Sequence, residues 1–176
     1  YFVKDGISYI GGKENVTKAQ FLIEESIKLF KTILGDDNLL IAHNYSNLPL
    51  ILNDIDRVKN TEISIKLSLK ALEIIEKNES KGTLDHFILN NNLALSLQSS
   101  GKLSNLIEAK AILKESLNFI RTSIYCGHYI EGQCLSNLAM ILYDIGEEDN
   151  LKTAICYNNL GHIYKKMKRY DEAELM

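Results

Sequence analysis

The sequence has no tryptophan, a single proline and three widely spaced cysteines. Because 45% of its residues are apolar and low-complexity segments are nearly absent, the chain has enough apolar material for a packed core, which argues against disorder. An odd number of cysteines at wide spacing does not suggest a disulfide framework, which favours a reducing compartment. No apolar run approaches the roughly 18 residues that would indicate a membrane span.

The sequence also lacks an excess of basic residues, since its formal net charge is -3. Nucleic-acid binding normally needs a basic face, so we expect no nucleic-acid partner. The chain opens with YFVKDG, without Met and without a signal-peptide pattern, so we expect it to be part of a longer protein. We expect an intracellular location, either cytoplasmic or cytoskeletal and ciliary, with an organelle left open.

Internal repetition is the strongest feature of the sequence. Five sets of residues recur at a step of 45 residues: Ala19, Ser64, Ala109 and Ala154; Asn15, Asn60, Asn105 and Asn150; Gly11, Asp56, Gly101 and Gly146; Asn47, Asn92 and Asn137, each followed by Leu; and Ser26, Ala71 and Ser116. Five columns that agree on one period indicate a structural repeat.

Each column suits a particular place in a pair of helices. Glycine can adopt the left-handed conformation that ends a helix. Asparagine four residues later suits an N-cap, and alanine or serine lets two helix backbones approach closely. Between these marks the apolar residues recur at helical spacing, as in Leu113, Leu117 and Ile120.

Each period therefore predicts two antiparallel helices, A and B, joined by a short turn. We expect A helices at about 40–55, 84–100 and 130–145, with a remnant near 2–10, and B helices at about 15–34, 60–78 and 105–124. A single hairpin cannot cover its own apolar faces, whereas stacked neighbours can, so the predicted fold is an all-α solenoid. We expect one repeat domain over residues 1–176, with repeats at about 1–37, 38–82, 83–127 and 128–176.

The segment TAICYNNLGHIYKKMKRYDEA, residues 153–173, resembles a tetratricopeptide repeat. Its Tyr157, Leu160, Gly161, Tyr164 and Ala173 hold the family's large aromatic, Leu, Gly, Tyr and Ala positions. The segment LGDDNLLIAHNYSNL, residues 34–48, resembles the linker and first helix of kinesin-light-chain-type repeats. The resemblance implies a right-handed superhelical solenoid of antiparallel helix pairs.

The sequence departs from the family pattern in three ways. The period of 45 is longer than usual, and the extra residues fall in the turn between helices A and B, as in SSGKLSN. Asp56 replaces the usual glycine, and Pro49 replaces the alanine that follows Asn-Leu. Because proline removes a backbone bond in a helix interior, we expect its helix either to begin late, capped by Ser46, or to kink.

The resemblance assigns a candidate binding role to the asparagine beside each leucine, which in the family points into the concave groove and can bond an extended peptide. The amide side chain both donates and accepts, as a peptide backbone requires. The alternative is that these residues only bridge neighbouring helices. The candidates are Asn47, Asn92, Asn137 and Asn159.

A charged clamp for a peptide carboxylate is not indicated by the sequence. Some members of the family use Lys and Arg at groove positions for this purpose, but the matching positions here hold other residues, so a chaperone-tail adaptor is disfavoured. Those positions are His43, Ser46, Ile88, Asn91, Gln133 and Ser136.

Motifs for catalysis, metal or phosphate binding are weak. GISYIGGKE lacks the spacing of a phosphate loop, and we interpret it as a turn. Cys126, His128 and Cys134 lack an evident fourth zinc ligand. Asp85 and His86 are better explained as capping residues than as an acid–base pair, and KKMKR as a solvated helix end. We therefore expect no enzyme, no catalytic residues, no metal and no cofactor.

The function predicted from these features is a non-catalytic scaffold for protein–protein interaction, a structural or adaptor subunit of a larger complex. The alternative is an adaptor that binds a linear peptide through the asparagine column. The partner is a protein or a linear peptide in either case. The weakness of any peptide anchor in the groove favours the structural subunit.

The final repeat breaks the period, because Asn159-Leu160 follows Asn137-Leu138 by only 22 residues. One explanation is that the last helix occupies a B position with an A-like sequence. The other, which we favour, is that about half a period is missing between Glu147 and Thr153.

Overall fold

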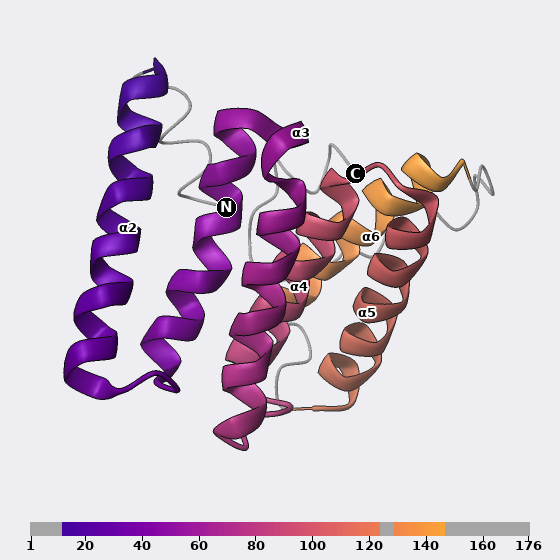
Figure 1. Ribbon diagram of the computed structural model, residues 1–176. Coiled ribbons are helices and arrows are strands. Elements are labelled where there is room, and N and C mark those ends of the chain that lie inside the picture. Colours follow the sequence, from indigo (N-terminus) through magenta and orange to yellow (C-terminus); the bar gives the residue numbers. More distant parts are fainter. Residues whose placement is uncertain (1–11, 124–128, 147–176) are drawn as a thin grey trace. The chain divides into compact units, whose positions relative to one another are not determined.

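The computed structural model describes residues 12–123 and 129–146, and every regular element in these ranges is an α-helix (Figure 1). The helices are α2 (Gly12–Leu34), α3 (Leu39–Lys77), α4 (Leu84–Ser99), α5 (Leu103–Thr122) and α6 (Tyr129–Ile145). The prediction of an all-α chain is confirmed for this part, and the expected helix bounds agree to within about three residues. None of the described helices is both long and apolar enough to cross a membrane.

The chain divides into two compact units, unit 1 (residues 1–81) and unit 2 (residues 82–176). The division falls next to the expected boundary between the second and third repeats. In unit 1, α2 and the first half of α3 form a hairpin around residues 35–38, and α3 then doubles back (Figure 1). Its core contains Ile41, Ala42, Leu48, Ile74 and Ile75.

Helix α3 contains the turn between an A helix and a B helix. Asp56 is its one non-helical residue, with φ -156° and ψ 96°, and the Asp56 Oδ1 accepts the backbone N–H of Lys59 at 3.1 Å. Asp56 therefore begins the B helix, and the prediction that Asn60 is an N-cap is wrong. The Asn60 Nδ2 instead donates to the Leu52 carbonyl at 2.8 Å, which ties the B helix back to the A helix.

The equivalent asparagines in the other repeats are not N-caps either. Helix α5 begins at Leu103 with Lys102 at the cap, and the Asn105 Nδ2 donates to the Ser100 Oγ at 2.9 Å. Asn15 lies inside α2. The glycine prediction is confirmed at Gly101 and Gly146, which have φ values of 65° and 72° at the ends of α4 and α6.

The predicted late start at Ser46 is wrong, because α3 begins at Leu39. Asn38 is the cap, and its side chain accepts the Leu40 N–H at 2.9 Å. Pro49 lies inside the helix and is fully buried. Proline cannot make one backbone hydrogen bond of the helix. The burial of its ring and the cap at Asn38 offset the free-energy cost of that missing bond.

Unit 2 packs α5 against both α4 and α6, and α4 also contacts α6. Apolar side chains from all three helices fill the space between them: Phe87, Leu89, Leu93, Leu113, Ile120, Ile130, Ile141 and Leu142. One ion pair closes the α5–α6 end, because the Arg121 Nε donates to Glu131 Oε1 at 2.9 Å and Glu131 is buried.

The small residues behave as predicted in the second and third repeats. Ser64, Ala71, Ala109 and Ser116 are buried with at most 2% exposure. Ala19 and Ser26, on α2, are only partly buried. The register is therefore confirmed in α3 and α5, whereas α2 meets fewer neighbours among the described residues.

Several predictions fall outside the described residues. They are the A remnant near 2–10, the interruption between Glu147 and Thr153, the final helix with Asn159, the cysteine–histidine pair Cys126 and His128, and KKMKR. Most of GISYIGGKE also lies there.

Candidate interaction surface

The asparagine column lies on the A helices, but its members differ in exposure. Asn47, on the first half of α3, is exposed, whereas Asn92 on α4 and Asn137 on α6 are buried at 9% and 8% exposure. Each is followed by a buried leucine: Leu48, Leu93 and Leu138. The leucine therefore packs into the core, as helical spacing predicts for the neighbouring position.

In unit 2 the column contains a direct bond between two A helices. The Asn137 Nδ2 of α6 donates to the Asn91 Oδ1 of α4 at 2.9 Å, and both side chains are buried. Beyond this hydrogen bond, the Asn91 Nδ2 can still donate and the Asn137 Oδ1 can still accept. Asn137 thus has the bridging role that the sequence left open.

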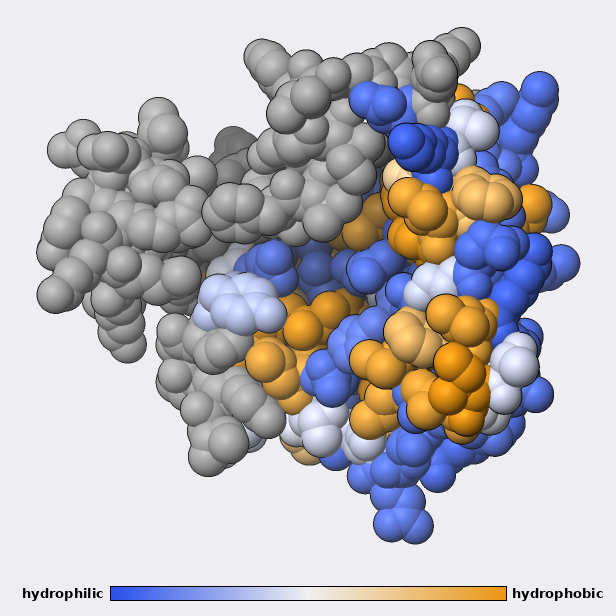
Figure 2. Space-filling model, turned by 90° about the vertical axis from the view of Figure 1, so that its left-hand side faces the viewer, coloured by the Kyte–Doolittle hydropathy of each residue, from blue (hydrophilic) through white to orange (hydrophobic). Residues whose placement is uncertain are grey.

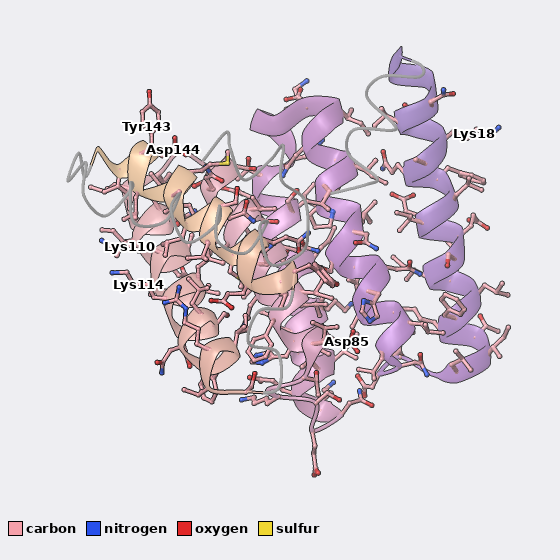
Figure 3. All side chains as sticks on the ribbon, turned by 180° about the vertical axis from the view of Figure 1, so that it is seen from behind. Lys18, Asp85, Lys110, Lys114, Tyr143 and Asp144 are labelled. Atoms are coloured by element: carbon pink, nitrogen blue, oxygen red, sulfur yellow. The ribbon has the colours of Figure 1, made fainter. Side chains whose placement is uncertain are left out.

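Further polar contacts join α4 to both of its neighbours. The Gln98 Nε2 donates to Asp144 Oδ2 of α6 at 2.6 Å, and the Asn90 Nδ2 donates to Ser116 Oγ of α5 at 3.3 Å. Asp144 lies near the end of α6, beside the exposed Tyr143 (Figure 3). These contacts were missed by the sequence analysis, although the run Asn90, Asn91, Asn92 is a visible signal for them.

The positions of the charged clamp hold no cation, as the sequence already shows. Ser46 and Asn91 are buried, and His43, Ile88, Gln133 and Ser136 are partly exposed. These positions therefore hold no lysine or arginine for a charged clamp.

Asp85 and His86 lie in the first turn of α4, but neither is its N-cap. The cap itself is Thr83, whose side chain accepts the His86 backbone N–H at 3.3 Å. The His86 Nδ1 accepts the Gly82 N–H at 3.1 Å, and its Nε2 lies 3.3 Å from Asn90 Nδ2. The imidazole therefore makes its contacts within the local turn. Asp85 lies in the first turn of α4 (Figure 3), where the helix dipole stabilises a negative charge.

Cys134 is buried in α6, and burial raises the pKa of its thiol to about 12, with Glu131 adding to the effect. A thiol with this pKa stays protonated at neutral pH and is a poor metal ligand. Within the described ranges, no three His, Cys, Asp or Glu side chains are placed to hold a metal ion.

An apolar stripe runs along α2 in unit 1. Leu22, Leu29 and Ile33 share one side of the helix and are 56%, 58% and 65% exposed. Apolar surface is visible on this side of the molecule, between polar regions (Figure 2). In the part of the chain that the structure describes, only α3 packs substantially against α2, so this stripe has no described helix over it.

Comparison with known proteins supports one repeat directly. Residues 153–176 match the family model described as a tetratricopeptide repeat. This segment includes Tyr157, Leu160, Gly161, Tyr164 and Ala173, on which the resemblance rests. No curated protein matches the chain. A tetratricopeptide-type repeat suggests a role in protein–protein interaction, and such repeats are generally non-catalytic.

Proposed function

We propose that this protein is a non-catalytic scaffold for protein–protein interaction, a structural or adaptor subunit of a larger assembly. Its repeats would form a tetratricopeptide-type solenoid, similar to that of kinesin light chains, with a period of about 45 residues. The family match at residues 153–176 and the helices that recur at this period support the proposal. An intracellular assembly, cytoplasmic, cytoskeletal, ciliary or organellar, is consistent with it.

The main observation in support of a structural-subunit role is the exposed apolar stripe on α2, formed by Leu22, Leu29 and Ile33. Apolar side chains gathered on one helix face mark a contact surface when they adjoin, whereas single exposed ones are ordinary. The residues of α5 that stand two periods after Leu22 and Leu29 are Ile112, which is partly buried, and Phe119, which is 54% exposed. The proposed occupant of the α2 stripe is a helix of another subunit.

The experiment is affinity purification of the full-length tagged protein from its native cells, followed by cross-linking and mass spectrometry. We expect stoichiometric partners that cross-link near α2. Replacing Leu29 and Ile33 with serine should release them. Phe21→Ser is the matched control, because Phe21 is 59% exposed on α2 but projects from a different side of the helix. A wild-type protein that elutes as a monomer from native extract would contradict the proposal.

The second candidate is an adaptor that binds a linear peptide through the asparagine column. It is favoured by one observation, the donor and acceptor that remain on the buried Asn91–Asn137 pair. Grooves of this kind commonly bind with micromolar affinity, about 8 kcal/mol. Asn92→Ala together with Asn137→Ala should weaken peptide binding in a calorimetric titration while circular dichroism shows an intact fold. Unchanged affinity would leave these residues with the bridging role alone.

A further inference from the structure

Helix α3 turns back on itself at a single residue. Of its 39 residues, Leu39–Lys77, only Asp56 departs from helical φ and ψ values. The two halves, residues 39–55 and 57–77, therefore lie antiparallel although almost no loop joins them (Figure 1). A turn of one residue disappears when two dihedral angles change, which would leave one continuous helix about 58 Å long.

The corresponding turn of unit 2 is built differently. Residues 100–102 separate α4 from α5, and Gly101 has a φ of 65°. The Ser100 Oγ donates to the Leu97 carbonyl at 2.7 Å and accepts the Lys102 backbone N–H at 3.1 Å, which holds this turn in place. A continuous helix would also place glycine in a helix interior, where it is less favourable than alanine. The turn at Asp56 has no glycine, so α3 is the helix that can straighten.

One set of side chains on α3 would form a continuous face on a straight helix. These side chains are buried or partly buried, and they recur every three or four residues on both sides of Asp56 without a break in the spacing. Helices that pair along their length show this spacing. The set comprises Ala42, Ser46, Pro49 and Asn53 before the turn, and Asn60, Ser64, Leu67, Ala71 and Ile74 after it.

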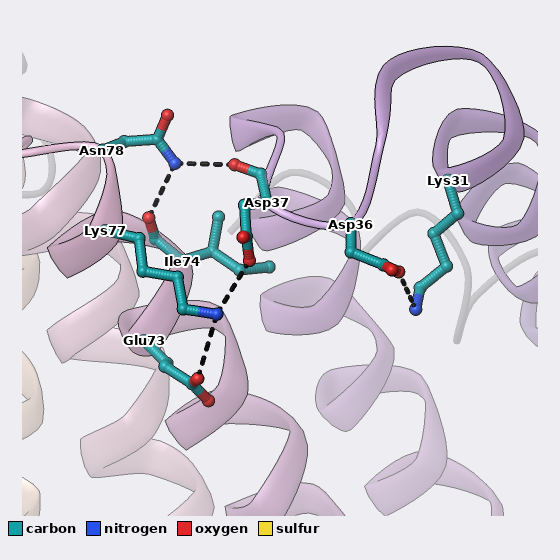
Figure 4. Close-up of polar contacts among 7 residues, drawn as sticks. All are labelled: Lys31, Asp36, Asp37, Glu73, Ile74, Lys77 and Asn78. Carbon is teal, nitrogen blue, oxygen red and sulfur yellow. Dashed lines mark hydrogen bonds and ion pairs between the residues drawn. The ribbon is translucent and has the colours of Figure 1, made fainter.

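The contacts between the two halves are arranged symmetrically along the chain. Close to the turn, the Ser64 Oγ donates to the Asn53 Oδ1 at 3.1 Å, and far from it the Lys77 Nζ lies 3.0 Å from the Asp37 Oδ1 (Figure 4). The two members of each pair stand at nearly equal distances along the chain from residues 57–58, which are also the middle of α3. Two straight α3 helices, antiparallel and related by a two-fold axis at these residues, can therefore form the same contacts between copies.

Asp56 decides between the closed turn and the straight helix. In the closed turn its Oδ1 accepts the backbone N–H of Lys59 at 3.1 Å, as an N-cap does. A continuous helix has no such cap, because the Lys59 N–H then bonds to the carbonyl of residue 55. The Lys59 Nζ also lies 3.6 Å from the Asp56 Oδ2, and the two-fold axis would place Asp56 opposite Lys59 of a second copy. The charges at the turn thus suit both arrangements.

We propose that unit 1 opens at Asp56 and exchanges its first half with a second copy of this chain. Helix α3 straightens, and α2 together with residues 39–55 of each copy packs on residues 57–77 of the other. The contacts between the halves are retained, so the exchange costs only the change at Asp56 and the freedom lost on association. This inference goes beyond the proposed scaffold role and does not depend on it.

The first test compares variants of residue 56 in the full chain. Samples of increasing concentration are warmed to just below the unfolding midpoint, cooled, and analysed by size-exclusion chromatography with light scattering. Asp56→Ala should strengthen dimerisation on the order of 100-fold, because each dimer has two hinges and the lost cap favours the straight form roughly tenfold at each. Asp56→Asn is the matched control. It keeps a capping side chain and should stay within about threefold of the wild type.

Arg57→Pro should have the opposite effect. Residue 57 is the first residue after the Asp56 cap, where proline fits a helix well, and proline also favours an extended conformation in the residue before it. In a continuous helix the same proline would clash with the carbonyl of residue 53. The variant should stay monomeric at concentrations at which the wild type dimerises, with an unchanged circular dichroism spectrum. A dimer of folded Arg57→Pro, or a monomeric Asp56→Ala at every concentration, would overturn the proposal.

Isotope-mixed cross-linking distinguishes exchange from simple association. Natural-abundance and nitrogen-15-labelled proteins are mixed before warming, and a carbodiimide then joins Lys77 to Asp37 wherever the two are in contact (Figure 4). In an exchanged dimer, cross-links between the two isotopes should be as frequent as those within one isotope, whereas a monomer gives only the latter. Lys77–Asp37 cross-links of a single isotope in the dimer fraction would show that the copies associate without exchange, and the proposal would be wrong.

Discussion

The two units use the same repeat positions in different ways. At the turn between helices A and B, unit 2 has Gly101 with a φ of 65°, whereas unit 1 has Asp56 with a φ of -156° and a side chain that caps the next helix. Glycine allows a left-handed residue that ends the first helix. In unit 1, Asp56 is itself the single extended residue, and its side chain caps the first turn of the second helix. The repeat position therefore specifies a change of direction, and two different local structures can provide it.

The B helices show a second difference. In α5 the residues Ala109, Leu113 and Ser116 are buried between α4 and α6, but in α2 the equivalent Ala19, Ile23 and Ser26 are partly exposed. A residue's contribution to stability depends on its burial in the fold, so equal positions in the sequence should not have equal energies. This expectation can be tested residue by residue.

The largest difference in unfolding free energy between α5 and α2 is expected at the equivalent apolar positions Leu113 and Ile23. Leu113 is fully buried, so Leu113→Ala should lower the free energy of unfolding by about 2–5 kcal/mol through lost apolar contact and a cavity. Ile23→Ala should cost clearly less, because Ile23 is only partly buried. Urea denaturation followed by circular dichroism measures both. Equal costs would show that α2 is as enclosed as α5.

The next largest difference in unfolding free energy is expected between two members of the asparagine column, Asn137 and Asn47. Asn137→Ala leaves the buried Asn91 oxygen without its donor, which should cost about 1–3 kcal/mol of unfolding free energy. Asn47→Ala, at an exposed position, should stay within about 0.5 kcal/mol of the wild type. Both values come from the same urea titration. A large cost at Asn47 would mean that it, too, has a partner in the intact protein.

How far the sequence predicts this structure depends on the range of the interactions involved. Helix bounds follow from apolar spacing and glycine, so the expected 105–124 corresponds closely to α5 at Leu103–Thr122. The roles of Asn60 and Asn105 were not predictable, because they depend on how the turn returns each side chain to the preceding helix. Pro49 was misjudged because burial compensates for its missing bond in a way that the local sequence does not show.

The candidate surface was predictable only in part. The sequence correctly assigns Asn92 and Asn137 to the A helices, but the bond to Asn91 depends on the register between α4 and α6. The peptide-binding role of the column stays a prediction. The ion pair between Lys77 and Asp37 was missed because these residues meet only when α3 doubles back (Figure 4).

The two turns should differ in their tolerance of substitution. Gly101→Ala should cost about 1–2 kcal/mol, because alanine at a positive φ is strained, although a Cβ there meets no other atom within 4 Å. Asp56→Gly should cost only a few tenths of a kcal/mol, since glycine is itself an acceptable N-cap. Urea midpoints of the two variants measure the difference. A costly Asp56→Gly would show that the aspartate side chain, rather than the backbone, maintains the turn.

The smallest expected effect is electrostatic and belongs to the turn of unit 1. Lys31 holds the pKa of Asp36 below its ordinary value of 3.8, so the charged carboxylate stabilises the folded state above that pH. This contribution should disappear as the pH falls through the lowered folded-state pKa, where Asp36 becomes protonated in both states. A carbon-13 NMR titration of the side chain measures the pKa directly. Lys31→Met should raise it toward 3.8, while Lys28→Met, which removes a lysine paired with Glu25 instead, should leave it nearly unchanged. An equal rise in both variants would mean that the general charge of α2, rather than the 2.6 Å contact with Lys31, lowers the Asp36 pKa.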